Sequence, residues 1–134
     1  VMTPFVVNSF YFCDPDGKTE YVGSRNPLPV DDRTPRIDRL TFRNIECHNC
    51  HVAGAYIYGL PEQKIAEVTM ENVHIDYAED AKPGVAAMML GCDASCRRGV
   101  VAANVEKLNL VNVKIEGAAT EPYELINVDS ITSK

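Results

Sequence analysis

One nine-residue pattern occurs three times in this chain. It reads IDRLTFRNI at 37–45, IAEVTMENV at 65–73 and VEKLNLVNV at 105–113. In each copy an apolar residue stands first, a second follows three places later, and an Asn stands seven places after the first. A pattern that returns at a constant internal register is typical of repeat architectures, in which each copy covers the next.

The copies are short and rich in Val, Ile, Thr and Asn, which favours strands over helices. A second strand is expected after each copy, at 55–60 (AYIYGL), 87–92 (AMMLGC) and 123–128 (YELINV). Aligning their ends predicts a tight corner, because Gly and Asn readily take left-handed backbone conformations. The predicted corner consists of Asn8, Gly59, Gly91 and Asn127.

These features predict an all-β fold, a right-handed parallel β-helix of about three coils. The repeated Asn44, Asn72 and Asn112 are expected to form a ladder of buried amides that bond from coil to coil. The alternative for these three residues is a solvent-facing turn position that recurs with the repeat. The alternative fold is an α/β architecture with amphipathic crossover helices.

The 134 residues are interpreted as one C-terminal β-helix segment. CDPDG at 13–17 predicts a turn. Pro27, Pro29 and Pro35 exclude regular helix and central strand around them, so the range 13–36 is predicted to be a long surface excursion. The additional length between the second and third copies predicts a loop insertion at 92–104.

Composition narrows the classes of partner. The net charge of −6 disfavours nucleic acid and anionic membranes as partners, but it allows an acidic polysaccharide held by local Lys and Arg. The chain contains no apolar run of the roughly 18 residues that span a bilayer. Its first residues resemble neither a signal peptide nor a natural start, so we expect a fragment of a longer protein. An open first coil would favour a homo-oligomer or a missing N-terminal portion.

The five cysteines are too few for a disulfide scaffold, and their odd number leaves at least one unpaired. This favours reduced thiols and a cytoplasmic location. The motif CHNCH at 47–51 has the form of a haem attachment site, and Cys92 and Cys96 could complete a zinc site with it. However, Cys47 occupies the column of Ile75 and Ile115, which indicates a buried strand residue. We therefore predict neither a metal nor another cofactor.

Asp31 and Asp32 offer a pair of carboxylates, the groups that glycosidases use. In PVDDRTPR an ion pair with Arg33 or Arg36 that holds the loop is the favoured interpretation.

The second strands present a candidate binding surface. If Val6, Ile57, Met89 and Leu125 point inward, then Tyr56 and Tyr58 point outward together with Phe5 and Val7. Exposed tyrosines beside the polar turn at 62–64 would suit a sugar ligand. Alternatively, the loop at 9–36 folds over this surface and buries it.

The run PFVVNSFYFCD, followed by the excursion and TPRIDRLTFRNI, resembles the C-terminal coils of glycoside hydrolase family 28, the polygalacturonases and their relatives. The matching residues are Pro4, Phe5–Val7, Asn8, Phe12, Cys13 and Asp14. The later copies, with their NI and NV endings, are similar to the later turns of that family.

This resemblance implies a parallel β-helix that hydrolyses α-1,4-galacturonan links of pectin with inversion. One Asp donates a proton to the leaving oxygen, and a carboxylate pair activates water. The family motifs NTD, GHG and RIK are absent, and the DD at 31–32 lies out of order. The chain also lacks the Tyr that the family often has at the strand occupied here by Pro4 and Phe5. Catalytic residues are therefore expected upstream, and none is assigned to this chain.

The chain itself is expected to form a wall of the substrate groove. The predicted contacts with acidic polysaccharide or oligogalacturonide are Asn8, Tyr11, Tyr56, Tyr58 and Gln63. The alternative function is a non-catalytic β-helix module that binds acidic polysaccharide or a protein partner.

Overall fold

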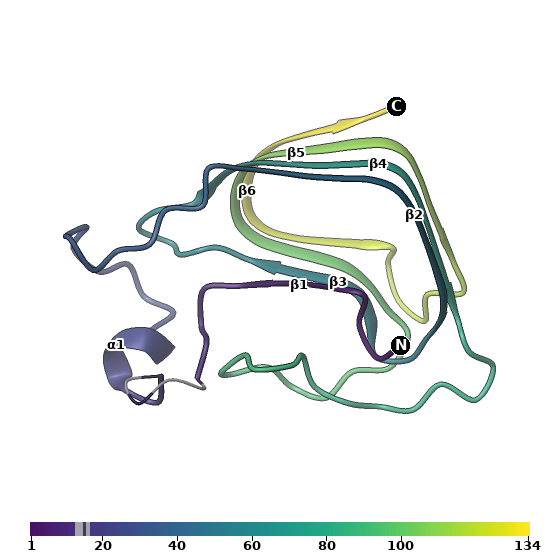
Figure 1. The fold of residues 1–134 in the computed structure, drawn as a ribbon, viewed down its shortest axis with the longest axis horizontal. Helices are drawn as coiled ribbons and strands as arrows, with labels where there is room; N and C mark the ends of the chain where they lie inside the picture. Colours follow the sequence, from purple (N-terminus) through teal and green to yellow (C-terminus); the bar gives the residue numbers. More distant parts are fainter. Residues whose placement is uncertain (13–14, 16) are drawn as a thin grey trace.

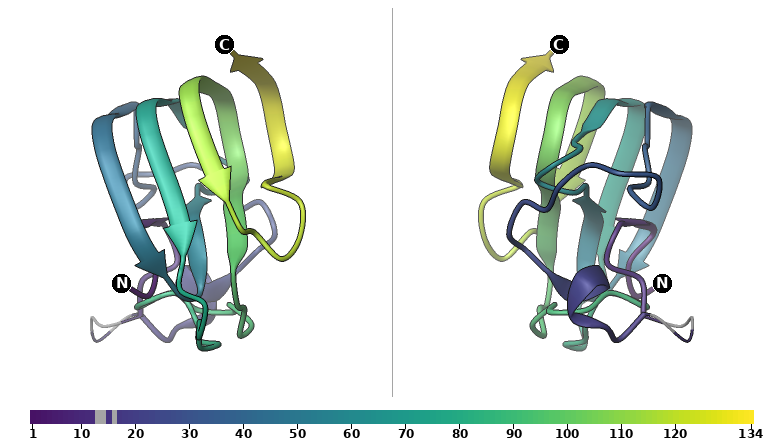
Figure 2. Two further views of the ribbon diagram at one scale, coloured as in Figure 1. Left: turned by 90° about the vertical axis from the view of Figure 1, so that its right-hand side faces the viewer. Right: turned by 90° about the vertical axis from the view of Figure 1, so that its left-hand side faces the viewer.

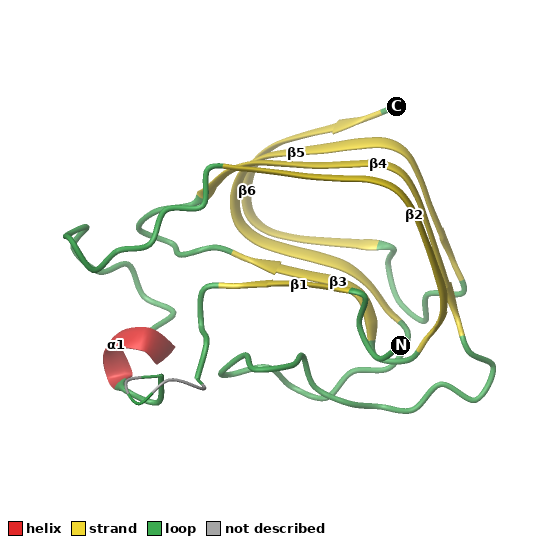
Figure 3. Ribbon diagram, in the orientation of Figure 1, coloured by secondary structure: helices red, strands yellow, loops and turns green. Residues whose placement is uncertain are grey.

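The structure is a computed structural model, and it describes residues 1–12, 15 and 17–134. Its strands are β1 (Phe5–Asn8), β2 (Arg39–Cys50), β3 (Ala53–Tyr58), β4 (Ile65–Tyr77), β5 (Arg98–Glu116) and β6 (Tyr123–Ser133), and its helix is the short α1 (Glu20–Gly23). Figure 3 shows that the rest of the described chain is loop. The all-β prediction is confirmed, but the predicted absence of regular helix from the excursion is wrong for the four residues of α1, which end before Pro27. Cys13, Asp14 and Asp16 lie outside the described residues, so the predicted turn at 13–17 stays a prediction.

The strands form one sheet in which all the strand pairs are parallel. The order is β1-β3-β5-β4-β2, and β6 pairs with β5. The sheet folds back on itself around an apolar interior (Figure 1), and its long strands lie side by side (Figure 2). This arrangement follows from the repeat, because equivalent positions of successive copies lie beside one another.

The register confirms that the three copies stack. Ile45 lies opposite Val73 and Val73 opposite Val113, while Ile65 lies opposite Val105. The second half of β6 adds a fourth layer, because residues 128–133 pair with 105–110. The given sequence ends at Lys134, before the position seven places after Val128 where the repeat Asn would stand, so the pattern at 37–45 did not reveal this layer.

The strands bend at what we call the three-Asn corner, formed by Asn44, Asn72 and Asn112. Their φ angles are 58°, 52° and 51°, in the left-handed region that Asn tolerates better than most residues. Asn72 Nδ2 donates to Asn44 Oδ1 at 3.0 Å, and Asn112 Nδ2 donates to Asn72 Oδ1 at 2.9 Å. The predicted amide ladder is therefore present. Its predicted burial is wrong, because the bend turns these side chains outward and all three are exposed.

A second bend, the mixed corner, consists of Gly59, Asn104 and Asn127. Asn127 Nδ2 donates to Asn104 Oδ1 at 2.8 Å, and Asn104 Nδ2 donates to the Gly59 carbonyl at 2.9 Å. Two members of the predicted corner do not belong here. Asn8 pairs with Tyr58, one place before Gly59, and Gly91 lies in a loop.

The strand predicted at 87–92 is wrong, and so is the second half of the loop insertion predicted at 92–104. Residues 98–103 of β5 supply the strand that pairs with β3, and the connection between β4 and β5 is the loop 78–97. The physical reason is that GVVAAN offers β-branched residues that pack on β3, whereas AMMLGC lies in the loop and covers the sheet from outside.

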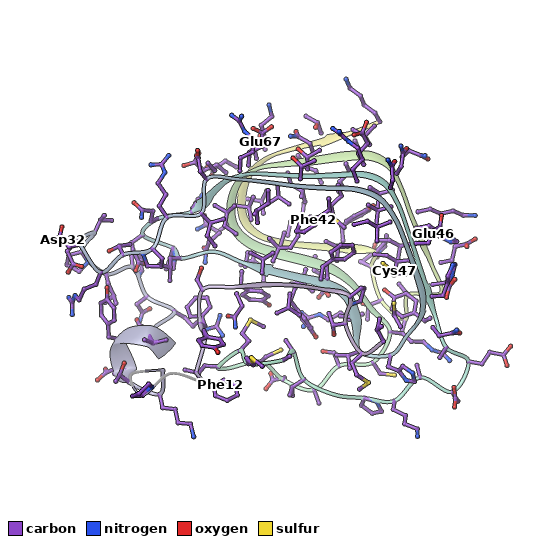
Figure 4. The ribbon with its side chains drawn as sticks, viewed as in Figure 1. Phe12, Asp32, Phe42, Glu46, Cys47 and Glu67 are labelled. Atoms are coloured by element: carbon purple, nitrogen blue, oxygen red, sulfur yellow. The ribbon has the colours of Figure 1, made fainter. Side chains whose placement is uncertain are left out.

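The interior core combines side chains from opposite sides of the folded sheet. Phe5 and Phe42 meet there edge to face, with ring centroids 5.0 Å apart. Ile57, Val68 and Leu108 are completely buried around them, and each contributes roughly 1.5–3 kcal/mol by leaving water. Cys47 lies opposite Ile75 with its side chain in the core, as predicted, and Figure 4 shows Phe42 and Cys47 pointing inward.

A second apolar cluster lies on the outer face of β3 and β5. Tyr56 and Val101 pack there against Phe10, Ala86 and Met89, which come from the chain after β1 and from the loop 78–97. Tyr56 is completely buried. The predicted exposure of its ring is therefore wrong, and the alternative of a covering loop is correct in part, because the loop 78–97 contributes as well.

The predicted facing of β1 is also wrong. Phe5 lies opposite Ala55 and Val7 opposite Ile57, so both belong to the interior, whereas Val6 lies beside Tyr56. Met89, predicted inward, is in the outer cluster. Leu125 lies opposite the interior Ala102, as predicted, but is 41% exposed, because among the described strands β6 pairs on one side, with β5. Alternation along a strand means that a one-residue shift in alignment exchanges the two faces.

Candidate functional site

A pocket of about 490 Å³ lies where the excursion meets the sheet. Its walls come from the chain after β1, from α1, from the end of the excursion and from the turn after β3. The residues lining it are Ser9, Tyr11, Pro15, Gly17, Tyr21, Val22, Arg33, Pro35, Leu60 and Glu62. α1 begins after Thr19, whose Oγ1 accepts a hydrogen bond from the Val22 amide, and this cap places Tyr21 and Val22 at the pocket.

Arg33 is the cation of this pocket. Its guanidinium carbon lies 4.2 Å from the centre of the Tyr21 ring, and its Nη2 lies 2.8 Å from Asp31 Oδ2. Hydrogen bonds from the Arg33 side chain and amide hold the pKa of Asp31 below its ordinary value. The predicted ion pair with Arg33 is confirmed, and Asp32 lies at the outer tip of the excursion (Figure 4). The Tyr21 ring and the Asp31 carboxylate together hold the guanidinium in place, although the Arg33 side chain is 67% exposed.

Glu62, on the turn after β3, is the carboxylate among the lining residues of the pocket. Its Oε2 is buried and has no hydrogen-bond partner among the described residues. A buried carboxylate oxygen without a donor is costly, so it is a favourable position for a hydroxyl donor from a ligand or from water.

The five predicted contact residues take different positions. Tyr11 lines the pocket and is 41% exposed. Gln63 supports one wall, because its Nε2 donates to the Pro35 carbonyl at 3.0 Å. Asn8 bonds the Met88 carbonyl at 2.8 Å, Tyr58 is half-buried near Arg25, and Tyr56 is buried outside the pocket. Their roles in sugar binding stay predictions.

Sequence reasoning missed Tyr21 and named Arg33 only as an ion-pair partner. Both lie in the non-repeating excursion, where no periodicity indicates which side chains converge. The available signal was an aromatic and a cation in a long proline-containing segment, because such segments are frequently functional.

The CHNCH motif is distributed over both faces of what we call the third wall, the part of the sheet formed by the last residues of β2, β4 and β5. Cys47 and Cys50 are buried free thiols; burial raises the pKa of both, that of Cys50 to about 11. His48 bonds Asp76 on the outer face, and His51 Nδ1 accepts a hydrogen bond from the Lys82 amide at 3.0 Å. No three His, Cys, Asp or Glu side chains in the described part of the chain are placed to hold a metal ion.

Comparison of the chain with protein-family models, with curated proteins and with solved structures finds no match. Within the described residues, the helical segment is far too short to cross a membrane.

Proposed function

We propose that this chain is a segment of a right-handed parallel β-helix that forms the C-terminal coils of a pectin-degrading hydrolase of the glycoside hydrolase family 28 type. Its own contribution is to bind acidic sugar units in the pocket beside the excursion. The stacked parallel strands, the two corners rich in Asn and the segments that resemble the family support this proposal.

The observation that carries the binding proposal is the convergence of Tyr11, Tyr21 and Arg33 on one pocket. Tyrosine rings offer flat faces to the C–H groups of a sugar. The planar guanidinium matches a carboxylate with two parallel hydrogen bonds, which selects a uronate over a neutral sugar. A volume of about 490 Å³ lies within the range of small-molecule sites.

Electrostatics limits the affinity. Asp31 already occupies one side of Arg33, and the chain has a net charge of −6. A uronate must therefore compete with Asp31 and approach an acidic protein. Binding is expected to be weak for a single sugar unit, and it should weaken further as salt screens the guanidinium.

Hydrolysis requires groups that we do not assign to this chain. An inverting mechanism needs one carboxylic acid at the leaving oxygen and a carboxylate that activates water on the opposite side. These groups are proposed to lie on coils that precede Val1, with the chain forming one wall and one end of the groove.

Calorimetric titration with tri-galacturonate at low salt tests the binding proposal. We expect binding that a neutral galactose trisaccharide does not reproduce, and about tenfold weaker binding for Arg33→Gln. Arg36→Gln is the matched control, because it removes the same charge from a side chain that pairs with Asp38 and is not among the lining residues. Absence of binding, or equal losses in both variants, would overturn the proposal.

The parent activity has a separate test. The coding sequence upstream of Val1 is expected to contain the motifs NTD, DD, GHG and RIK in that order. Their absence would reject the hydrolase assignment and would leave a binding module as the remaining function.

A further inference from the structure

The outer face of the third wall carries two columns of charged side chains. This wall consists of the last residues of β2, β4 and β5, which lie side by side (Figure 2). One column runs from Glu46 through His74 to Lys114. In the neighbouring column His48 bonds Asp76, and Asp76 lies opposite Glu116. Glu46 points away from the interior in Figure 4.

His74 is at the centre of this network, and both of its ring nitrogens face carboxylates. Nδ1 lies 2.9 Å from Glu46 Oε2 on β2, and Nε2 lies 2.6 Å from Glu116 Oε2 on β5. Ionised carboxylates only accept hydrogen bonds, and a neutral imidazole has one N–H. Both contacts are hydrogen bonds only when His74 carries two ring protons and a positive charge.

The neighbouring groups determine the charge balance around His74. From β2, His48 Nδ1 lies 2.6 Å from Asp76 Oδ2, and its Nε2 lies 3.7 Å from Glu46 Oε2. From β5, Lys114 Nζ lies 2.8 Å from Glu116 Oε1. Three carboxylates thus face one lysine, an arrangement that favours a positive charge on His74 between Glu46 and Glu116.

We propose that this network is a proton-operated clasp: protonated His74 ties the ends of β2, β4 and β5 together, and loss of its proton releases one carboxylate and loosens these strand ends. The clasp joins neighbouring strands through residues 28 and 42 positions apart in the sequence. It is independent of the sugar pocket, to which it contributes no residue.

The direction of the pH effect follows from the pKa shifts. The bond to Glu116, and then the bond to Glu46, raise the pKa of His74. Stabilisation by the clasp is therefore fully present below the unfolded-state pKa of His74 and is lost as pH rises through the raised folded-state pKa. On the acid side, Lys114 and then His74 lower the pKa of Glu116, and the bond from His48 lowers that of Asp76. The clasp thus opens again only when these carboxylates take up protons.

The clasp also reaches the loop 78–97, which covers Tyr56 from outside. That loop begins directly after β4, and the Ala78 amide donates to the Cys50 carbonyl at 3.0 Å. Asp76 Oδ1 on β4 accepts a hydrogen bond from the Asn49 amide on β2 at 2.7 Å. Opening of the network is therefore expected to loosen the last residues of β2 and β4. We expect amide exchange at 73–78 to report the opening.

The test is a histidine titration by NMR combined with amide hydrogen exchange. His74 is expected to titrate at higher pH in the natural chain than in the double variant Glu46→Gln, Glu116→Gln. Exchange at 73–78, corrected for its intrinsic pH dependence, should accelerate as His74 loses its proton. His74→Gln should lose this pH-dependent protection, whereas His51→Gln should keep it.

Equal titration midpoints of His74 in the natural chain and the double variant would overturn the proposal. So would a pH profile of exchange that His74→Gln leaves unchanged. If His74→Gln fails to fold, the double variant decides the question by itself, because it retains the imidazole and near-isosteric side chains.

Discussion

The two corners of the sheet contain the same type of residue but differ in how they are held. The three-Asn corner is a ladder of exposed side chains, each bonded to the amide of the next. The mixed corner uses a glycine, and there the carbonyl of Gly59 accepts the bond of a partly buried Asn104. The first corner therefore depends on side chains and backbone conformation, and the second depends also on close approach of two backbones.

The largest effect is expected for Gly59→Ala. A Cβ at this position would lie 2.3 Å from the Asn104 carbonyl oxygen, so the two backbones would have to separate. The free energy of unfolding should fall by about 3 kcal/mol. Urea unfolding measures this loss, with Gly23→Ala as the control, because a Cβ there meets Leu90 at an ordinary 3.5 Å. Equal stability of both variants would show that the close approach is not required.

Asn104→Ala and Asn72→Ala compare the corners directly. Both place Ala at a left-handed φ, which costs about 1–2 kcal/mol, and both remove amide bonds. Asn104→Ala should be the more destabilising by about 1 kcal/mol, because it leaves the Gly59 carbonyl without its partly buried donor. The reverse order in urea unfolding would contradict the distinction between the corners.

Asn72→Gly separates conformation from hydrogen bonding. Glycine accepts the left-handed backbone, so only the ladder bonds and some chain entropy are lost, and the cost should be about 1 kcal/mol. Thermal unfolding of Asn72→Gly beside Asn72→Ala measures the difference. If the two variants were equally unstable, the ladder bonds would dominate this corner.

The smallest effect concerns reactivity and not stability. Cys47 and Cys50 lie behind the wall that follows the three-Asn corner, and burial raises the pKa of both thiols. They should resist a thiol reagent at pH 8 in the folded chain and react once the chain is unfolded in urea. Rapid modification of either thiol in the native chain would mean that this wall opens more readily than the mixed corner.

Much of the sheet could be predicted because the repeat carries its own register. The Asn positions and the stacking of Cys47 on Ile75 follow from alignment of the copies with one another. Residues 98–103 were not assigned correctly, because AMMLGC resembles AYIYGL in its apolar character and its glycine. A separate error, the alignment of Asn8 with Gly59 when it pairs with Tyr58, placed the residues of β1 on the wrong faces, since alternation exchanges the faces with each one-residue shift.

The candidate site could be predicted only in part. Tyr11 was identified from its position after β1, but Tyr21 and Glu62 meet it only through the course of the excursion. Burial of Tyr56 likewise depends on the loop 78–97, which contacts it from about thirty residues further along the chain. Contacts of this kind leave no periodic trace in the sequence.

The sequence by itself determined that the chain is all β, that its copies stack in register and that each copy carries an Asn at the three-Asn corner. These properties are local or repeat at a constant interval, so the order of the residues encodes them directly. The tertiary structure decided which face of β1 is interior, which segment covers Tyr56, and which side chains meet around Arg33 and His74. Those properties depend on where non-repeating loops return to the sheet and on which strands become neighbours, and both are consequences of packing the whole chain.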